Sequence, residues 1–158
     1  MQRFVQVRNP SITQIPHKWS DLIQVMECLK PTLKVTKVFW RPPPQDWVSC
    51  NTDGASRGNP GRGAYGFCIR DTQGDVIVAK ADDIGFVTNV EAETIAILEV
   101  VKWCHEHQVN HIIFQTDSQF VQKVSQGVWK PPWAIVEWIE HIQFMLSDKQ
   151  CRFEHILR

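Results

Sequence analysis

One stretch of the chain constrains the fold more than any other, the sequence CNTDGASRGNPGRGAYG of residues Cys50–Gly66. Asp53 ends a short run of strand-like residues, and glycines follow at close intervals together with Pro60. Glycine tolerates positive φ angles and lets another backbone approach closely. A Gly-rich loop beside a carboxylate therefore has room for a phosphate group and a metal ion, although an aspartate at a strand–turn junction is more often a solvated turn residue.

The length of 158 residues suits one ordinary domain, and a hydrophobic content of 43% is sufficient for a sizeable core. The net charge is zero but unevenly spread. Residues 1–40 carry six basic against two acidic residues, whereas residues 41–158 carry eleven against fifteen. The chain thus lacks the strongly basic character of many nucleic-acid-binding domains. A nucleic acid partner would require cations to offset the acidic part of the chain.

The five cysteines are odd in number and include no CxxC pair, so the sequence indicates neither a disulfide framework nor a zinc ribbon. We expect reduced, mostly buried thiols. The first residues lack the apolar core of a signal peptide, and no apolar run reaches membrane-spanning length. These features predict a soluble, intracellular, monomeric protein with no membrane partner, in either nucleus or cytoplasm.

A proline run, Arg41-Pro42-Pro43-Pro44, divides the chain. We expect residues 1–44 to form an N-terminal arm, a short helix near residues 20–30, an extended segment at Lys34–Trp40 and a stiff polyproline linker. We expect residues 45–158 to form the principal domain.

Within the principal domain the hydrophobic pattern alternates at first and later takes a helical period. It predicts the order β-β-β-α-β-α-α-β, with strands at Asp46–Asp53, Ala64–Arg70, Val76–Ala81, His111–Thr116 and Cys151–Leu157 and helices at Glu91–His107, Ser118–Ser125 and Trp133–Leu146. A hairpin turn at Asp71–Asp75 follows the second strand, and the three consecutive strands indicate an antiparallel meander. The fold class is therefore α/β, with a mixed five-stranded sheet flanked by helices.

Three carboxylates fall where ligand sites gather in such folds, at strand ends and helix starts. Asp53 ends the first strand, Glu93 lies in the first turn of the first long helix, and Asp117 follows the fourth strand. Clustered carboxylates repel one another unless a cation neutralises them. Oxygen ligands of this kind suit Mg²⁺, with Mn²⁺ as the alternative, and two such ions can activate a water for phosphodiester cleavage. A solvated helix face and an N-cap at Asp117-Ser118 explain the same residues without a metal.

Three segments carry a resemblance to a known family: NTDGASRGNPGRGAYGFCIRDTQG, TNVEAETIAI and FQTDSQFVQKV. In order and spacing they resemble the ribonuclease H domain of plant retroelement-like, reverse-transcriptase-associated proteins. The resemblance covers Trp40–Arg158, and residues 1–39 resemble more weakly the end of the reverse transcriptase polypeptide. It implies a hydrolase, an endonuclease that cleaves the RNA strand of RNA–DNA hybrids with two Mg²⁺ ions held by four carboxylates.

The resemblance assigns three of those carboxylates. Asp53 stands in the TDG motif, Glu93 in the Ala-Glu pair and Asp117 in the TDS motif, so these are the implied catalytic and metal-binding residues. Glu91 does not fit, because two positions along a helix correspond to a rotation of about 200°.

The resemblance also implies contacts to the RNA backbone. Asn59 in the Gly-rich loop, Asn89 before the helix and Ser118 in the TDS motif match or adjoin positions that bind nucleic acid in the family. An amide side chain can both donate to and accept from the 2′-hydroxyl that distinguishes RNA from DNA. Each asparagine equally suits a turn or a helix cap.

The chain departs from the family pattern at its end. The family continues with a segment like REGN and an Ala-Asp pair on a final helix, which supplies the fourth carboxylate. The sequence reaches His155-Ile156-Leu157-Arg158 where that segment would begin, and neither Asp148 nor Glu154 matches the motif. We therefore expect a ribonuclease H-like domain truncated at its C-terminus, without its last helix, in which one metal is weakly held and activity is reduced.

Two other functions fit the sequence. One is a catalytically inactive nucleic-acid-binding domain of the same fold that keeps Asn59 and Asn89. The other is a structural retroelement remnant in which the helix near residues 20–30 and the proline run dock a partner.

Two further clusters carry weaker hypotheses. Cys104, His105, His107 and His111 suggest zinc, but His105 and His107 face apart on a helix. The segment Trp129–Trp133 suggests contact with a DNA strand, but a rigid inter-helix loop with Trp133 on a core face is the favoured interpretation.

Overall fold

The computed structural model describes residues 18–28 and 39–156. The chain divides into two units, one ending at Phe39 and one beginning at Trp40. In the first unit the expected short helix is present as α2 (Trp19–Cys28), with Asp21 in its first turn, where a negative charge suits the helix dipole. The predicted N-terminal arm, and nearly all of the predicted extended segment before Trp40, lie outside the described residues.

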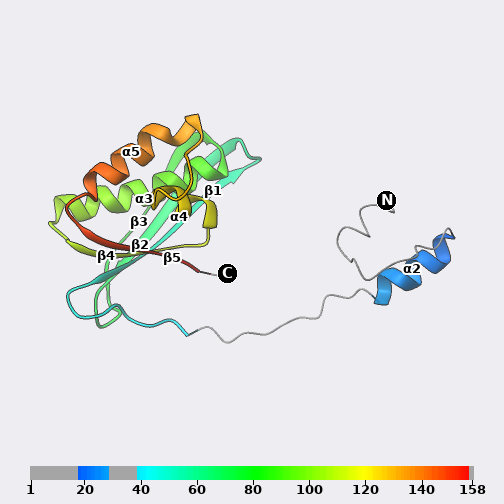
Figure 1. The fold of residues 1–158 in the computed structure, drawn as a ribbon, viewed down its shortest axis with the longest axis horizontal. Helices are drawn as coiled ribbons and strands as arrows, with labels where there is room; N and C mark the ends of the chain where they lie inside the picture. The colour runs from blue at the N-terminus through cyan, green and yellow to red at the C-terminus, as the bar shows by residue number, and fades with distance from the viewer. Residues whose placement is uncertain (1–17, 29–38, 157–158) are drawn as a thin grey trace. The chain divides into compact units, whose positions relative to one another are not determined.

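A five-stranded sheet in the order β3-β2-β1-β4-β5 forms the base of the second unit. Its strands are β1 (Val48–Arg57), β2 (Gly61–Arg70), β3 (Val76–Val87), β4 (His111–Thr116) and β5 (Gln150–His155). The first three pair antiparallel as consecutive hairpins, whereas β4 pairs parallel with β1 and β5 parallel with β4. The predicted mixed sheet with an initial antiparallel meander is confirmed, and Figure 1 shows its arrangement.

Helices α3 (Asn89–Glu106) and α5 (Val136–Met145) pack on each other, and α3 also packs on β1 and β2 (Figure 1). The short α4 (Gln119–Ser125) and a 3₁₀ turn, η1 (Trp133–Ile135), connect β4 to α5. Sheet and helices bury a shared apolar core that includes Ile69, Ile97, Val101, Phe114, Ile139 and Ile142. In the described part of the chain, no helix combines the length and apolar character needed to cross a membrane.

The β1–β2 hairpin differs from the sequence-based prediction. We expected Asp53 to end the first strand and a Gly-rich loop to follow, but β1 continues to Arg57 and β2 already begins at Gly61. The predicted loop is therefore mostly paired strand, and the turn between the two strands is short.

Close packing explains why one of these strand residues, Gly54, is a glycine. A side chain at Gly54 would overlap the backbone of Ala92 and Glu93 in α3. Glycine inside a strand marks such a close approach. Gly54, one of the glycines that suggest a loop in the sequence, therefore lets α3 lie directly on β1.

Trp133 was predicted on a core face, and this prediction is wrong, because its side chain is 91% exposed. The chain reaches α5 through Pro132, which precedes the 3₁₀ turn and cannot donate a backbone hydrogen bond. Because of this turn, Ile135 rather than Trp133 enters the core, where it is fully buried.

Cys50 in β1 and Cys104 in α3 are buried free thiols. Burial, reinforced by the neighbouring Cys104 thiol, raises the pKa of Cys50 well above its ordinary value. The group is therefore a neutral core residue at physiological pH, as expected of buried cysteines.

Candidate active site

Asp53 lies in the middle of β1, and its exposed side chain is not covered by the facing residue on β2, which is Gly66. The next residue, Gly54, lies against the backbone of α3 at Glu93. This contact places the Asp53 carboxylate beside the N-terminal half of α3.

Glu93 is positioned by the start of α3. Thr88 is the N-cap: its hydroxyl accepts a hydrogen bond from the Glu91 amide at 3.2 Å, and the Glu91 carboxylate accepts one from the Thr88 amide at 2.6 Å. This reciprocal capping box defines where the helix begins. Glu93 then lies one helical turn inside α3, where its side chain is 8% exposed.

Two hydrogen bonds join the β1–β2 hairpin to the beginning of α3. The Asn89 side-chain oxygen accepts from the Ser56 amide at 2.8 Å, and the Asn59 side-chain oxygen accepts from the Asn89 amide at 2.9 Å. The Ser56 hydroxyl also donates to the Val87 carbonyl at 2.6 Å. Together with the capping box, these bonds fix the helix that carries Glu93 to the strand that carries Asp53.

Asp117 lies directly after β4 and before α4. The Ser118 amide donates to the Thr116 hydroxyl at 3.1 Å, and the Ser118 hydroxyl accepts from the Val121 amide at 3.3 Å as the N-cap of α4. The turn is also tied to the neighbouring strand, since the Ile156 amide donates to the Thr116 carbonyl at 3.0 Å.

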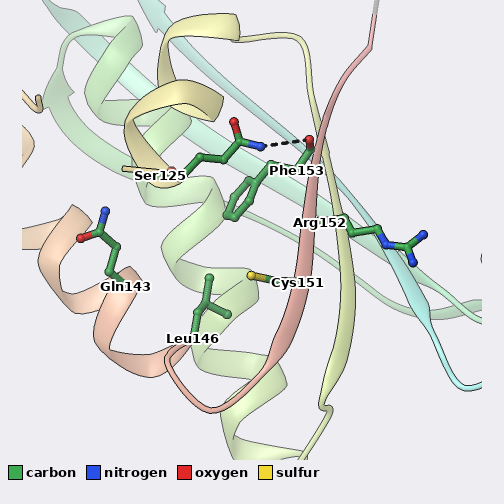
Figure 2. Close-up of a pocket in the computed structure, with 7 residues that line it drawn as sticks. Ser125, Gln143, Leu146, Cys151, Arg152 and Phe153 are labelled. Atoms are coloured by element: carbon green, nitrogen blue, oxygen red, sulfur yellow. Dashed lines mark hydrogen bonds between the residues drawn. The ribbon is translucent and has the colours of Figure 1, made fainter. Parts of the chain in front are cut away.

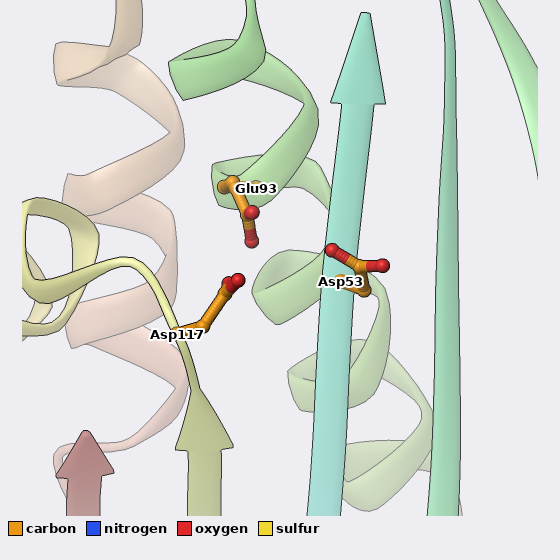
Figure 3. A group of neighbouring side chains, drawn as sticks. All are labelled: Asp53, Glu93 and Asp117. Carbon is orange, nitrogen blue, oxygen red and sulfur yellow. The ribbon is translucent and has the colours of Figure 1, made fainter. Parts of the chain in front are cut away.

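The three carboxylates converge, although they are far apart in the sequence. One carboxylate oxygen from each of Asp53, Glu93 and Asp117 can be chosen so that all three lie within 4.8 Å of one another. Figure 3 shows the side chains meeting from β1, from α3 and from the end of β4. Among the described residues this group has three members, and Glu91, engaged in the capping box, is not one of them.

The donor set fits a hard divalent cation. Three carboxylates in such proximity repel one another, and a cation between them offsets that repulsion. Oxygen donors without sulfur or imidazole favour Mg²⁺ or Mn²⁺ over zinc or copper. The cluster can therefore hold a metal through Asp53, Glu93 and Asp117.

The three candidates for binding nucleic acid, Asn59, Asn89 and Ser118, differ in the contacts that they make within the protein. Asn59 and Asn89 each use the side-chain oxygen within the protein, so their amide nitrogens are the groups that can face a ligand. Ser118 uses its oxygen as the cap acceptor and keeps a hydroxyl hydrogen to donate.

Among the hollows formed by the described residues, two lie on different parts of the domain. One of about 300 Å³ lies on the sheet beside two of the carboxylates, and its lining includes Asn51, Asp53, Gly66, Asp117 and Ile156. The other, of about 550 Å³, lies between α4, α5 and β5. Figure 2 shows Phe153 directed toward these helices and Arg152 directed away from them. Because the second hollow is lined by no carboxylate, the first is the better candidate for metal-dependent chemistry.

The suggested zinc ligands have other contacts. Cys104 is buried in the core, the His107 ring bonds to the Trp103 carbonyl at 2.8 Å, and the His111 ring stacks on Trp47 with centroids 5.3 Å apart. In the described ranges these residues form no group able to share a metal.

Sequence reasoning missed the residues that support the carboxylates. Neither Ser56 nor His155 was singled out, and the His155 ring nitrogen Nε2 lies 3.0 Å from the Asp117 backbone carbonyl. This contact depends on the pairing of β5 with β4, which places His155 opposite Thr116. A motif search does not use that pairing.

Residues 51–158 match the model of a family described as reverse transcriptase-like. Ribonuclease HI of Halobacterium salinarum is 36% identical to the chain over 77 residues, which make up 49% of this chain and 39% of that protein. The chain spans less than two thirds of the length of the curated relatives that it matches.

Solved structures share the fold. The crystal structure of RNase H1 from Halobacterium salinarum superposes with a TM-score of 0.66 and 28% identity, covering 71% of this chain and 86% of that one. LC11-RNase H1, solved in complex with an RNA/DNA hybrid, superposes with a TM-score of 0.65 and 25% identity, covering 70% and 86%.

Proposed function

The chain belongs to the reverse transcriptase-like family, as a ribonuclease H domain, and on that premise we propose that it hydrolyses the RNA strand of RNA–DNA hybrids. The observation that carries the proposal is the convergence of Asp53, Glu93 and Asp117 on one point of this fold. The names of the relatives support it, and so does the hybrid bound in a related structure. The products would be RNA fragments cut within the strand, which makes the reaction endonucleolytic.

The three carboxylates are the proposed metal ligands and catalytic residues. Mg²⁺ held there, in the proposed two-ion arrangement, would activate a water and neutralise charge on the scissile phosphate. The protein's own contribution is to hold three mutually repelling groups at one point. Asp53 is held by β1, Glu93 by the capped start of α3, and Asp117 by its turn after β4.

The amide nitrogens of Asn59 and Asn89 are the proposed donors to RNA 2′-hydroxyls. Both asparagines belong to the junction that also positions α3, so a bound RNA strand would lie close to Glu93. Ser118 is the proposed donor to a phosphate oxygen near Asp117. Selection of the RNA strand would then depend on the 2′-hydroxyl rather than on base sequence.

A second function remains in competition with hydrolysis, namely hybrid binding without cleavage. This function is favoured because the cluster contains three carboxylates among the described residues, where the family resemblance implies four. Three ligands can leave one of two metal positions weakly held, and a reduced rate follows from the lost charge stabilisation. Mn²⁺ tolerates imperfect ligand geometry better than Mg²⁺, so activity in Mn²⁺ distinguishes a weak enzyme from a binding domain.

The test is cleavage of an end-labelled RNA–DNA hybrid by the full chain in Mg²⁺ and in Mn²⁺. We expect cleavage of the RNA strand, with Mn²⁺ at least as effective as Mg²⁺. Asp53→Asn should abolish it, and Asp148→Asn, at an exposed aspartate outside the cluster, is the matched control. Hybrid binding without cleavage in either metal would contradict the enzyme proposal and favour the binding domain.

A further inference from the structure

The end of β5 lies beside the turn that carries Asp117. Strands β4 and β5 run parallel, and their register places His155 opposite Thr116, the residue before Asp117. The Ile156 amide donates to the Thr116 carbonyl at 3.0 Å, and the His155 Nε2 atom lies 3.0 Å from the Asp117 carbonyl oxygen. The last residue of β5 and the residue after it therefore bond to the successive carbonyl groups of Thr116 and Asp117.

The His155 side chain makes this bond from an exposed position. A carbonyl oxygen only accepts hydrogen bonds, so Nε2 must be the donor. An exposed ring is not held in place by surrounding core side chains. Its position is thus explained by the bond to Asp117 rather than by burial.

Asp117 lies in a short connection whose backbone the His155 bond reaches directly. It is the one residue between Thr116, the last residue of β4, and Ser118, the N-cap of α4. Both neighbours have bonds of their own to strand or helix. Rotation of the peptide group that follows Asp117 would move its carbonyl away from β5, and the carboxylate can then leave the position where it meets Asp53 and Glu93.

We propose that His155 is a positioning residue, which holds the Asp117 peptide group so that the carboxylate remains in the metal-binding cluster; this rests on the proposed function of that cluster. His155 acts through Asp117 and need not touch the substrate. Residues that orient a metal ligand usually change metal affinity by 10- to 100-fold when removed. Because His155 bonds to the backbone rather than to the carboxylate, we expect an effect at the lower end, about 10-fold.

The experiment compares full-length wild type with His155→Leu, which removes the donor, and His155→Gln, whose amide can still donate to the carbonyl. His141→Leu, at an exposed histidine of α5, is the matched control. Two quantities are measured for each variant: the Mn²⁺ affinity by calorimetry without substrate, and the Mg²⁺ concentration that gives half the maximal cleavage rate. Melting temperatures are recorded alongside.

We expect His155→Leu to weaken Mn²⁺ binding and to raise the half-saturating Mg²⁺ concentration by about 10-fold, with a smaller change in the rate at saturating metal. His155→Gln should recover most of the affinity, and His141→Leu should match the wild type. Unchanged metal affinity in His155→Leu would overturn the proposal. Equal losses in His155→Leu and His155→Gln would also overturn it and would indicate a direct role of the imidazole.

The outcomes separate this proposal from the proposed activity. If the wild type binds Mn²⁺ but cleaves no hybrid, hydrolysis is excluded, and the calorimetric comparison still decides the role of His155. If the wild type binds no Mn²⁺, both proposals fail.

Discussion

Glu93 and Asp117 contribute to the same cluster but are held in different ways. Glu93 depends on what we call the hairpin brace, the hydrogen-bonded set of Ser56, Asn59, Thr88, Asn89 and Glu91. Asp117 depends on what we call the edge brace, formed by Thr116, His155 and Ile156. The edge brace relies on β5, the last strand in the sheet order.

The difference lies in which part of the site each brace contacts. In the hairpin brace, several bonds converge on the start of α3, and the close contact at Gly54 fixes the helix independently of them. In the edge brace, the bond from His155 reaches the backbone of Asp117 directly. Loss of one bond of the hairpin brace leaves the Gly54 contact to hold Glu93, whereas loss of the His155 bond acts on the Asp117 backbone directly. Metal affinity is the quantity in which this contrast should appear.

The largest effect is expected in the cleavage rate, when Glu93, a residue of the carboxylate cluster, is compared with Glu91, a residue of the hairpin brace on the same helix. Glu93→Gln should lower the hybrid cleavage rate by roughly 10³-fold, because loss of several kcal/mol of charge stabilisation corresponds to several factors of ten. Glu91→Gln should change the rate by about twofold or less, since glutamine also serves at the third position of a capping box. Single-turnover cleavage rates at saturating Mg²⁺ measure both. Comparable losses in the two variants would remove the distinction between site and brace.

A smaller effect is expected within the hairpin brace, where two substitutions of Asn89 divide its roles. Asn89→Ala removes the acceptor for the Ser56 amide and should lower the free energy of unfolding by about 1 kcal/mol. Asn89→Asp keeps an acceptor but loses the amide donor. It should therefore retain more stability than Asn89→Ala while losing preference for a hybrid over a DNA duplex of the same sequence.

Urea denaturation and competition binding with the two duplexes measure these Asn89 effects. The duplexes carry the same phosphate charge, so the added negative charge of Asn89→Asp weakens both and cancels in the ratio. Neither variant should change Mn²⁺ affinity as much as His155→Leu. If Asn89→Ala lowers Mn²⁺ affinity more than His155→Leu does, the contrast between the two braces is reversed.

Local patterns were sufficient to predict the order of the elements and the mixed sheet. His111–Thr116 was predicted with its observed bounds, because a short apolar run between polar turns has few alternative conformations. The bounds of the β1–β2 hairpin were not predicted correctly. Its glycines fit a loop, and they fit equally a strand on which a helix packs closely. Only the packing of α3 on Gly54 distinguishes these two explanations.

The carboxylates of the candidate site were predictable from the sequence, whereas the residues that support them were not. Asp53, Glu93 and Asp117 stand in recognisable motifs, and the fold brings them to one point. The braces do not follow from motifs, because Ser56 and His155 acquire their partners from segments far away in the sequence. Their contacts depend on strand register and on the junction of a hairpin with a helix, which a single sequence does not reveal.

The central claim is that Asp53, Glu93 and Asp117 form one divalent cation site. It is tested most directly by anomalous scattering from crystals of the full chain soaked in Mn²⁺, with Asp117→Asn crystals as the comparison. The account predicts an anomalous peak within coordination distance of all three carboxylates in the wild type, and a weaker peak or none in the variant. A wild-type structure at saturating Mn²⁺ without a peak among these carboxylates would contradict it.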